Sequence, residues 1–267
     1  MRSSVDRIFD LLQALVAEPR GLQLTDLART AQLARPTAHR LLADLIRRGL
    51  VHQESSGNYF ISLTLAGMGL EQLARRGFLD LFQPILDELA ERCGELVRVA
   101  WLEEERLVFV AEAQGSGPGL RYDANLGRQA VLHVTAVGKC YLAQMPFPEA
   151  VRHIEDQSML RDPRLGPRAL RSITALKLEL RRVKHQGYAI AFDEAEVGAA
   201  AVAVPIVGAA RKFLGSLAIV GPSARLDRSK LASWIPNLNQ AVTALAHLAP
   251  LERYCHKTET NMRRRMA

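Results

Sequence analysis

Residues 33–48 constrain this chain most, because their spacing predicts a single amphipathic helix. At about 100° per residue, one side of that helix is apolar and carries Ala38, Leu41, Leu42 and Leu45. The opposite side has Arg40 at its centre, and the small Ala43 leaves room there for a flat partner. Pro36 suits the first helical turn, and Gly49 suits the position just past the last one. Taken alone, such a face is typical of a solvated helix surface.

The segments on either side change that interpretation. One helix is expected over residues 4–18 and a shorter one over residues 26–31, with Thr25 as its N-cap. Two short apolar runs then flank a polar turn at 54–58 and predict a β-hairpin. Two short helices, a tight turn, an Arg-bearing helix and a hairpin make a winged helix-turn-helix, in which Arg40 can reach a guanine edge or a phosphate. The alternative is a small α+β domain that binds protein.

Composition and charge exclude several classes of protein. The 267 residues are enough for two domains. Without an apolar run of about 18 residues, neither a membrane span nor a signal peptide is expected, and we expect a cytoplasmic protein that joins the nucleoid when bound to DNA. Three distant cysteines exclude a disulfide framework and a Cys-x-x-Cys site, and Cys140 is expected in the core. The net charge of +7 permits nucleic-acid binding without arguing for it.

The remaining chain predicts a second domain of different architecture, in which strands grouped as hairpins lie between helices. The expected strands are 96–102, 107–113, 120–122, 130–134, 188–192, 200–207 and 213–220. The expected helices are 64–77, 79–92, 135–145, 148–157, 174–186 and 231–248, the last interrupted by Pro236. We therefore expect an α+β fold. It comprises a winged helix-turn-helix domain (1–64), a linker helix (65–77), an antiparallel sheet covered by helices (78–250) and a flexible tail (251–267).

A strand-to-helix junction near Gly138 invites a phosphate-loop interpretation. His133 and Cys140 stand where that loop needs a glycine and a Ser or Thr, which argues against nucleotide hydrolysis. What remains is a helix start whose free N–H groups and Thr135 hydroxyl could hold a carboxylate or another anion. The alternative is an ordinary helix N-terminus.

An acidic turn beside a strand of small residues is the other candidate. Asp193 and Glu194 precede the alanine-rich strand at 199–204, whose side chains are too small to fill a pocket. We interpret this strand as the floor of a cavity and the acids as its polar rim, with solvated turn acids as the alternative.

The spacing of nucleophiles and metal ligands does not indicate an enzyme. No Gly-x-Ser-x-Gly, HExxH or similar spacing is present, so no catalytic residue, metal site or cofactor is predicted. A small-molecule hydrolase or lyase built on residues 79–250 is kept as the alternative function.

Motifs from both halves of the chain together resemble one family. They are Leu24-Thr25-Asp26-Leu27-Ala28, Arg35-x-Thr37-Ala38-His39-Arg40-Leu41-Leu42, a wing ending in Tyr59, Thr135-Ala136-x-Gly138-Lys139, Gly187-Tyr188-Ala189, Gly198 followed by Val202-Ala203-x-Pro205, and Gly221-Pro222. In this order, from about residue 4 to residue 248, they resemble the IclR family of bacterial transcription regulators.

The resemblance implies a sequence-specific, non-enzymatic DNA-binding regulator. Its C-terminal domain, of GAF-like fold, would bind a small-molecule effector, an organic acid or aromatic compound, that modulates operator binding or activity. The implied DNA contacts are Thr25, Arg35, Pro36, Thr37, His39, Arg40, Arg47 and Asn58. The implied effector contacts are Thr135, Ala136, Gly138, Asp193, Glu194, Ala201 and Ala203. The expected partners are double-stranded DNA with a palindromic operator, the effector, a second copy of the chain (as a dimer or a dimer of dimers) and RNA polymerase.

The chain also departs from the family pattern. Gln32 stands where the family usually has a glycine in the turn, and Pro36 where it often has Ser. Ala201 replaces a frequent Cys, and Ala218 and Val220 replace frequent Ser residues. The expected pocket is therefore less polar than usual, so known effectors cannot be transferred to this chain.

Overall fold

A computed structural model describes residues 3–75, 78–117, 122, 126–154, 162–208 and 211–248. The chain divides into two compact units, 1–77 and 78–267, which are described separately below. The assignment of 65–77 as a linker stays a prediction, and the tail at 251–267 lies outside the described residues. Among the helices of the described residues, none is long and apolar enough to cross a membrane.

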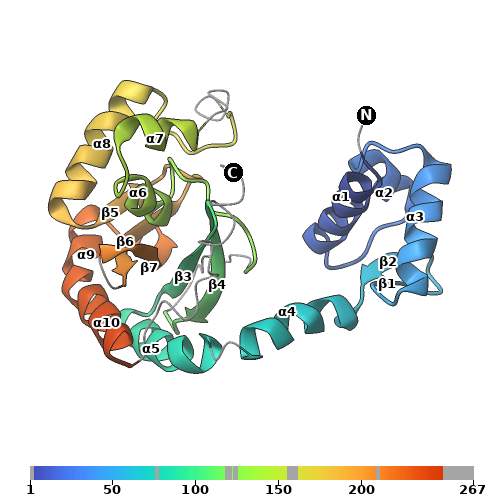
Figure 1. The fold of residues 1–267 in the computed structure, drawn as a ribbon, viewed down its shortest axis with the longest axis horizontal. Helices are drawn as coiled ribbons and strands as arrows, with labels where there is room; N and C mark the ends of the chain where they lie inside the picture. Colours follow the sequence, from blue (N-terminus) through green and yellow to red (C-terminus); the bar gives the residue numbers. More distant parts are fainter. Residues whose placement is uncertain are drawn as a thin grey trace, which may run out of the picture. The chain divides into compact units, whose positions relative to one another are not determined.

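The first unit is a winged helix-turn-helix, as the spacing predicts (Figure 1). Its elements in chain order are α1 (Ser4–Ala17), α2 (Leu24–Thr30), α3 (Arg35–Arg47), β1 (Val51–Gln53), β2 (Tyr59–Ile61) and α4 (Leu63–Arg75). Ser3 and Asp6 form a capping box that fixes the start of α1, with Ser3 N–H donating to the carboxylate at 2.8 Å. The core of the unit collects the apolar faces of the first three helices with Val51 and Tyr59.

One local detail of this unit differs from the expectation, and one departure from the family pattern is explained. The second helix begins at Leu24 with Gln23 as its N-cap, so the prediction of Thr25 as the cap is wrong. Gln23 is already extended, and the helix starts without a side-chain cap bond. In the turn before α3, Gln32 adopts a left-handed conformation with φ of 53°. This conformation favours glycine, so a side chain here is strained.

The second unit is built on a five-stranded antiparallel sheet with strand order β4-β3-β7-β6-β5. Its strands are β3 (Leu96–Glu103), β4 (Arg106–Gln114), β5 (Ala189–Phe192), β6 (Ala199–Val207) and β7 (Phe213–Pro222). Its helices are α5 (Phe78–Cys93), α6 (Ala136–Leu142), α7 (Phe147–Arg152), α8 (Ile173–Gln186), α9 (Arg228–Ser233) and α10 (Ile235–Leu248). The expected α+β class with an antiparallel sheet covered by helices is confirmed.

The two faces of this sheet carry side chains of different size. One face presents large aliphatic residues such as Val99, Val202 and Leu217, which pack with α5 and α10. The other face presents mainly small residues, among them Ala100, Ala191, Ala203 and Ala218, beneath α6. Helix α8 packs in turn against α6, so α6 lies between the sheet and α8 (Figure 1).

Several expected elements of this unit are corrected. Residues 130–134 form no strand: 132–134 are a turn, in which the Thr135 N–H bonds back to the Val131 carbonyl at 3.2 Å. The helix expected over 135–145 ends at Leu142, and that expected over 148–157 ends at Arg152, with 155–157 outside the described residues. The C-terminal helix is two helices, with Pro236 in the first turn of α10. Of the strand expected at 120–122 only Tyr122 is described, and it lies in no strand.

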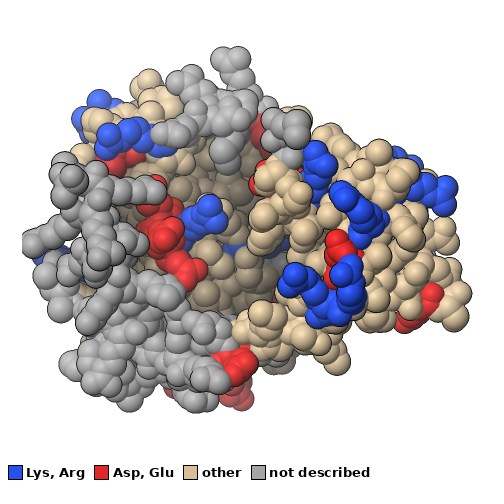
Figure 2. All heavy atoms as spheres, turned by 45° about the vertical axis from the view of Figure 1, so that its right-hand side comes forward, with Lys and Arg blue, Asp and Glu red and all other residues tan. Residues whose placement is uncertain are grey.

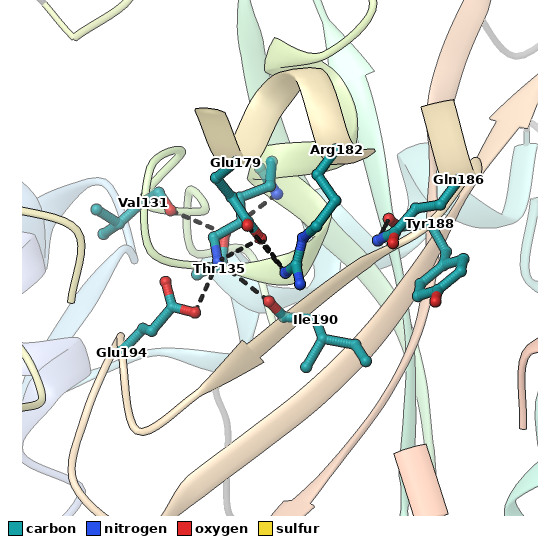
Figure 3. A network of polar contacts seen from close by, with 10 residues as sticks. Val131, Thr135, Glu179, Arg182, Gln186, Tyr188, Ile190 and Glu194 are labelled. Carbon is teal, nitrogen blue, oxygen red and sulfur yellow. Dashed lines mark hydrogen bonds and ion pairs between the residues drawn. The ribbon is translucent and has the colours of Figure 1, made fainter. Parts of the chain in front are cut away.

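A buried ion-pair network fixes α6 against its neighbours. Lys139 is 1% exposed, and its ammonium group lies 2.7 Å from the carboxylate of Glu194 and 3.4 Å from that of Glu179 on α8. It also donates to the carbonyl of Ile190 on β5 at 3.0 Å. Figure 3 shows these three acceptors converging, with Arg182 on the far side of Glu179. Burial raises the pKa of the Glu194 carboxyl, and Lys139 opposes that rise.

This network predicts a large loss of stability on substitution of Lys139. Lys139→Met leaves Glu194 buried without its counterion, so the free energy of unfolding should fall by about 3 kcal/mol. Urea unfolding followed by tryptophan fluorescence measures this, because both tryptophans, Trp101 and Trp234, lie in the second unit.

The control is Lys184→Met, which changes an exposed lysine of α8 and should alter stability by less than about 0.5 kcal/mol. Lys139→Met combined with Glu194→Gln should recover part of the loss. A double variant as unstable as Lys139→Met alone would contradict the role of the pair.

Candidate functional site

Helix α3 separates its residues as the spacing predicts. Ala38, Leu41, Leu42 and Leu45 are buried in the core of the first unit. The opposite face is open: Arg35, Pro36, His39 and Arg40 are exposed and Thr37 is half-buried. Pro36 lies in the first turn, and Gly49 follows the helix with φ of 71°. The helix therefore presents a polar, Arg-bearing face with no bulky apolar residue at its centre.

The other predicted DNA contacts lie around this helix in the same unit. Thr25 is exposed on α2. Arg47 forms an ion pair with Asp44 one turn earlier on α3. Asn58 lies at the end of the hairpin turn, and its side-chain amide donates to the Arg20 carbonyl at 3.5 Å. Figure 2 shows basic side chains spread over the visible face of this unit, with fewer acidic ones among them.

A hollow opens beneath α6 on the small-residue face of the sheet, with a volume of about 550 Å³ when the space open to solvent is included. It is lined by Arg98, Phe109, Tyr122, Val134, Thr135, Ala136, Val137, Ala191, Ala195, Ala199, Ala200, Ala201, Ala218 and Val220. Eleven of these fourteen residues are apolar, and seven are alanines. A concave, mostly apolar site with a few polar groups is the usual form of a small-molecule site.

Three of the predicted effector contacts line this hollow: Thr135, Ala136 and Ala201. Ala201 stands across the sheet between Ala191 on β5 and Val220 on β7, so these three form one row of the floor. Thr135 caps α6 by accepting from the Gly138 N–H at 3.2 Å, and its hydroxyl donates to Val131 at 2.8 Å. The Thr135 hydroxyl proton is therefore used within the chain's own turn and is not available to an anion, while the anion site at the free N–H groups of this helix start stays a prediction.

The other four predicted contacts do not line the hollow. Ala203 is fully buried under α6, where its carbonyl accepts from the thiol of Cys140 at 3.3 Å. The expectation that Ala203 belongs to the cavity floor is thereby corrected, because α6 covers that part of the strand. Cys140 is a core residue as predicted, and burial raises the pKa of its thiol to about 12. Gly138 allows α6 to approach the turn before it, since a Cβ there would overlap the Leu132 backbone.

The acids of the 193–198 turn do not line the hollow, but their contacts fix the turn that forms one of its walls. Asp193 accepts from the Gly198 N–H and from the Ser223 hydroxyl, both at 2.9 Å. Glu194 belongs to the Lys139 network. Between them, these contacts fix the turn that carries Ala195 into the lining.

Three polar or aromatic lining residues were not predicted. Arg98 and Phe109 come from the edge hairpin β3–β4, and Tyr122 donates its hydroxyl to Glu196. One signal was present, because Arg98 interrupts the otherwise apolar run of β3 and a charged residue there needs a partner. Phe109 and Tyr122 carried no such signal.

Arg98 is the only charged residue among the described residues that line the hollow. It is 4% exposed, and its Nε lies 3.1 Å from the carboxylate of Glu112 on the neighbouring strand. The guanidinium also lies 3.7 Å from the centre of the Phe109 ring, within cation–π range. Burial lowers the pKa of Arg98 and Glu112 opposes this, so the group stays charged.

Comparison with known proteins gives the family. Residues 71–247 match the family described as bacterial transcriptional regulator IclR C-terminal, and residues 4–55 match the IclR helix-turn-helix domain. The HTH-type transcriptional regulator XynR of Escherichia coli K12 is 28% identical over 247 residues, covering 91% of this chain and 95% of that protein.

Solved structures share the fold at lower identity. An IclR transcriptional regulator from Alicyclobacillus acidocaldarius has a TM-score of 0.75 at 21% identity, covering 92% of this chain and 98% of that one. An IclR homolog from Microbacterium hydrocarbonoxydans, complexed with 4-hydroxybenzoate, has a TM-score of 0.72 at 21% identity with the same coverage.

Both domain matches and the curated relative describe transcriptional regulators and not enzymes, so the hydrolase or lyase alternative is not supported. The chain belongs to the IclR family of bacterial transcriptional regulators, with an N-terminal DNA-binding helix-turn-helix and a C-terminal ligand-binding domain.

Proposed function

We propose that this regulator binds a specific operator and that a small organic acid or aromatic compound, held in the hollow beneath α6, modulates its operator binding or activity. The observation that carries the proposal is the hollow itself, which is lined mainly by alanine and valine in the ligand-binding domain of the family. The Microbacterium structure supports it, because that protein of the same fold is complexed with an aromatic acid.

The proposed effector contacts are the predicted residues that line the hollow. Thr135 and Ala136 come from the start of α6, and Ala201 comes from the floor. The other four predicted contacts lie behind that lining. Gly138 allows α6 to approach the turn before it, and Ala203 packs under α6. Asp193 and Glu194 fix the position of the 193–198 turn.

The proposed DNA surface is the open face of α3 with its surroundings. Arg40, at the centre, reads base edges together with Thr37 and His39, while Arg47 contacts phosphate. The rest of the surface is formed by Arg35 and Pro36 at the start of α3, by Thr25 on α2 and by Asn58 at the hairpin turn. Two copies on a palindromic operator place their α3 helices about 34 Å apart.

A second copy of the chain is the proposed partner in solution. Large apolar side chains stand exposed on α1 (Val5, Phe9 and Val16) and on α4 (Leu63 and Met68). Exposed large apolar side chains are typical of an association surface. We propose that this surface forms a dimer, which can pair again into a dimer of dimers, and that RNA polymerase is a further partner on DNA.

Substitution of Arg40 tests the DNA surface. Arg40→Ala should weaken binding to the operator by about 1–3 kcal/mol and leave binding to random DNA much less affected, because it removes a base contact. Fluorescence anisotropy with DNA from the protein's own promoter region and with random DNA, at one fixed salt concentration, measures both affinities.

Arg47→Ala is the matched variant. Because Arg47 is proposed to contact phosphate, its substitution should weaken binding to both DNAs about equally. Equal losses on both DNAs for Arg40→Ala would contradict its proposed role in base reading.

Filling the hollow tests the ligand site. Ala201→Leu adds three carbon atoms to the floor and should abolish the rise in melting temperature caused by a bound organic acid or aromatic compound. A ligand at 100 times its Kd adds about 2.7 kcal/mol to the wild type, which a thermal-shift screen detects.

Ala201→Ser is the control, since it adds a single oxygen atom and should keep the shift. Operator binding without ligand should be retained by both variants, which shows that they fold. A full shift with Ala201→Leu would mean that the ligand binds elsewhere.

A further inference from the structure

A groove of the ligand-binding domain lies between α8 and the connection from α6 to α7 (Figure 1). Its volume is about 530 Å³ when the space open to solvent is included. It is lined by Leu142, Ala143, Met145, Pro146, Phe147, Lys177, Leu180, Arg181 and Lys184, and is called the α8 groove below. It shares no lining residue with the hollow beneath α6, so it is a separate surface of the same domain.

The two walls of the α8 groove differ in charge. The α8 wall carries three cations, Lys177, Arg181 and Lys184. Their spacing of i, i+4 and i+7 places them in one row along about 10 Å of the helix. The opposite wall, residues 142–147, contributes apolar residues alone to the lining, and no carboxylate lines either wall. A bound molecule therefore meets an edge of positive charge and an apolar edge.

The cation row is not neutralised within the part of the chain that the structure describes. Glu179, the one acidic residue of α8, pairs with Lys139 and Arg182. No described carboxylate forms an ion pair with any of the three cations, all of which are exposed. Like charges one helical turn apart disfavour a helix slightly, and a bound anion would remove that cost. The Lys177 ammonium lies 5.4 Å from the centre of the Phe147 ring on the apolar wall.

The surface around the row favours a macromolecule over a small ligand. At about 100° per residue, Leu180 lies on the groove side of the row and Leu178 on its outer side. Leu180 is 4% exposed, whereas Leu178 is 63% exposed. A partner that covers the three cations thus reaches an exposed apolar side chain outside the groove. A helix laid along α8 repeats the spacing of the row, so its carboxylates can meet all three cations while its apolar side chains enter the groove.

We infer that the α8 groove binds an acidic amphipathic helix of another protein. The carboxylates of that helix pair with the cation row, and its apolar side chains contact residues 142–147. This goes beyond the proposed function, because the groove contains none of the residues assigned there to the effector or to DNA.

A synthetic peptide tests the inference on the full chain. The helical peptide has roughly 15 residues, with glutamates at i, i+4 and i+7 beside a stripe of leucines. Fluorescence anisotropy of the labelled peptide measures its Kd. It should bind about tenfold or more tightly than a scrambled peptide of the same composition and than a peptide with glutamine for glutamate, because three exposed charge pairs contribute a few-fold each. A scrambled peptide that binds as tightly, or a designed peptide that does not bind, would overturn the inference.

Charge reversal locates the bound peptide. Lys177→Glu with Arg181→Glu should weaken binding about tenfold or more. The same variant should bind a peptide with lysines in place of the glutamates more tightly than the wild type does, which shows that the reversed groove is folded. The matched control, Arg152→Glu with Lys212→Glu, reverses two exposed cations of the same unit outside the groove and should change the affinity by less than about twofold. Binding that resists reversal in the groove would overturn the inference.

Other occupants of the groove give different results. Inorganic pyrophosphate is the probe for a small-anion site, and it should bind more weakly than the designed peptide. Analytical ultracentrifugation should give the groove variant the same mass as the wild type. Pyrophosphate that binds more tightly than the peptide and is lost on reversal would make the groove a small-molecule site. A lower mass of the variant would make it an interface between copies of this chain. Either result would overturn the inference.

Discussion

A difference in side-chain size between the two faces of one sheet underlies the ligand-binding domain. Valine, leucine and isoleucine on one face pack with α5 and α10 into a continuous core. Alanines on the other face lie under α6, and where the helix begins they leave a hollow open. Close packing on one face stabilises the domain, so the opposite face can stay incompletely filled and hold a ligand site. Larger residues on the alanine face would convert the hollow into a second core and leave the domain without a ligand site.

The roof of the hollow is held by charge as well as by packing. Lys139 ties α6 to α8 through Glu179, to β5 through Ile190, and to the 193–198 turn through Glu194. The same turn carries Ala195 into the lining, so one buried network fixes two walls of the site. Buried ion pairs contribute little net stability but are costly to break, and they specify one arrangement of the groups around them. A ligand that displaces α6 or this turn would therefore act on a well-defined element.

The sequence predicted the first unit better than the second because its signals are local. Helical spacing, Pro36 and Gly49 located α3 correctly, and only the start of α2 was misplaced. In the second unit, the hairpins and the alanine floor at Ala201 were foreseen. The extent of α6 over Ala203 was not, because it depends on tertiary packing. Phe109 was missed because a bulge reverses the alternation that sequence reasoning relies on. Tyr122 was expected in a strand at 120–122 but lies in none, so its place in the lining could not be inferred.

The DNA-binding and ligand-binding domains gain a regulatory meaning only if their two equilibria are coupled. Thermodynamic linkage then requires that a ligand change operator affinity by the same factor by which the operator changes ligand affinity. The most direct measurement is the Kd of a bound acid for the free protein and for the protein saturated with operator DNA. The account predicts that the two values differ, and that their ratio equals the ratio of operator affinities measured with and without the acid. An identical Kd in both states would contradict it.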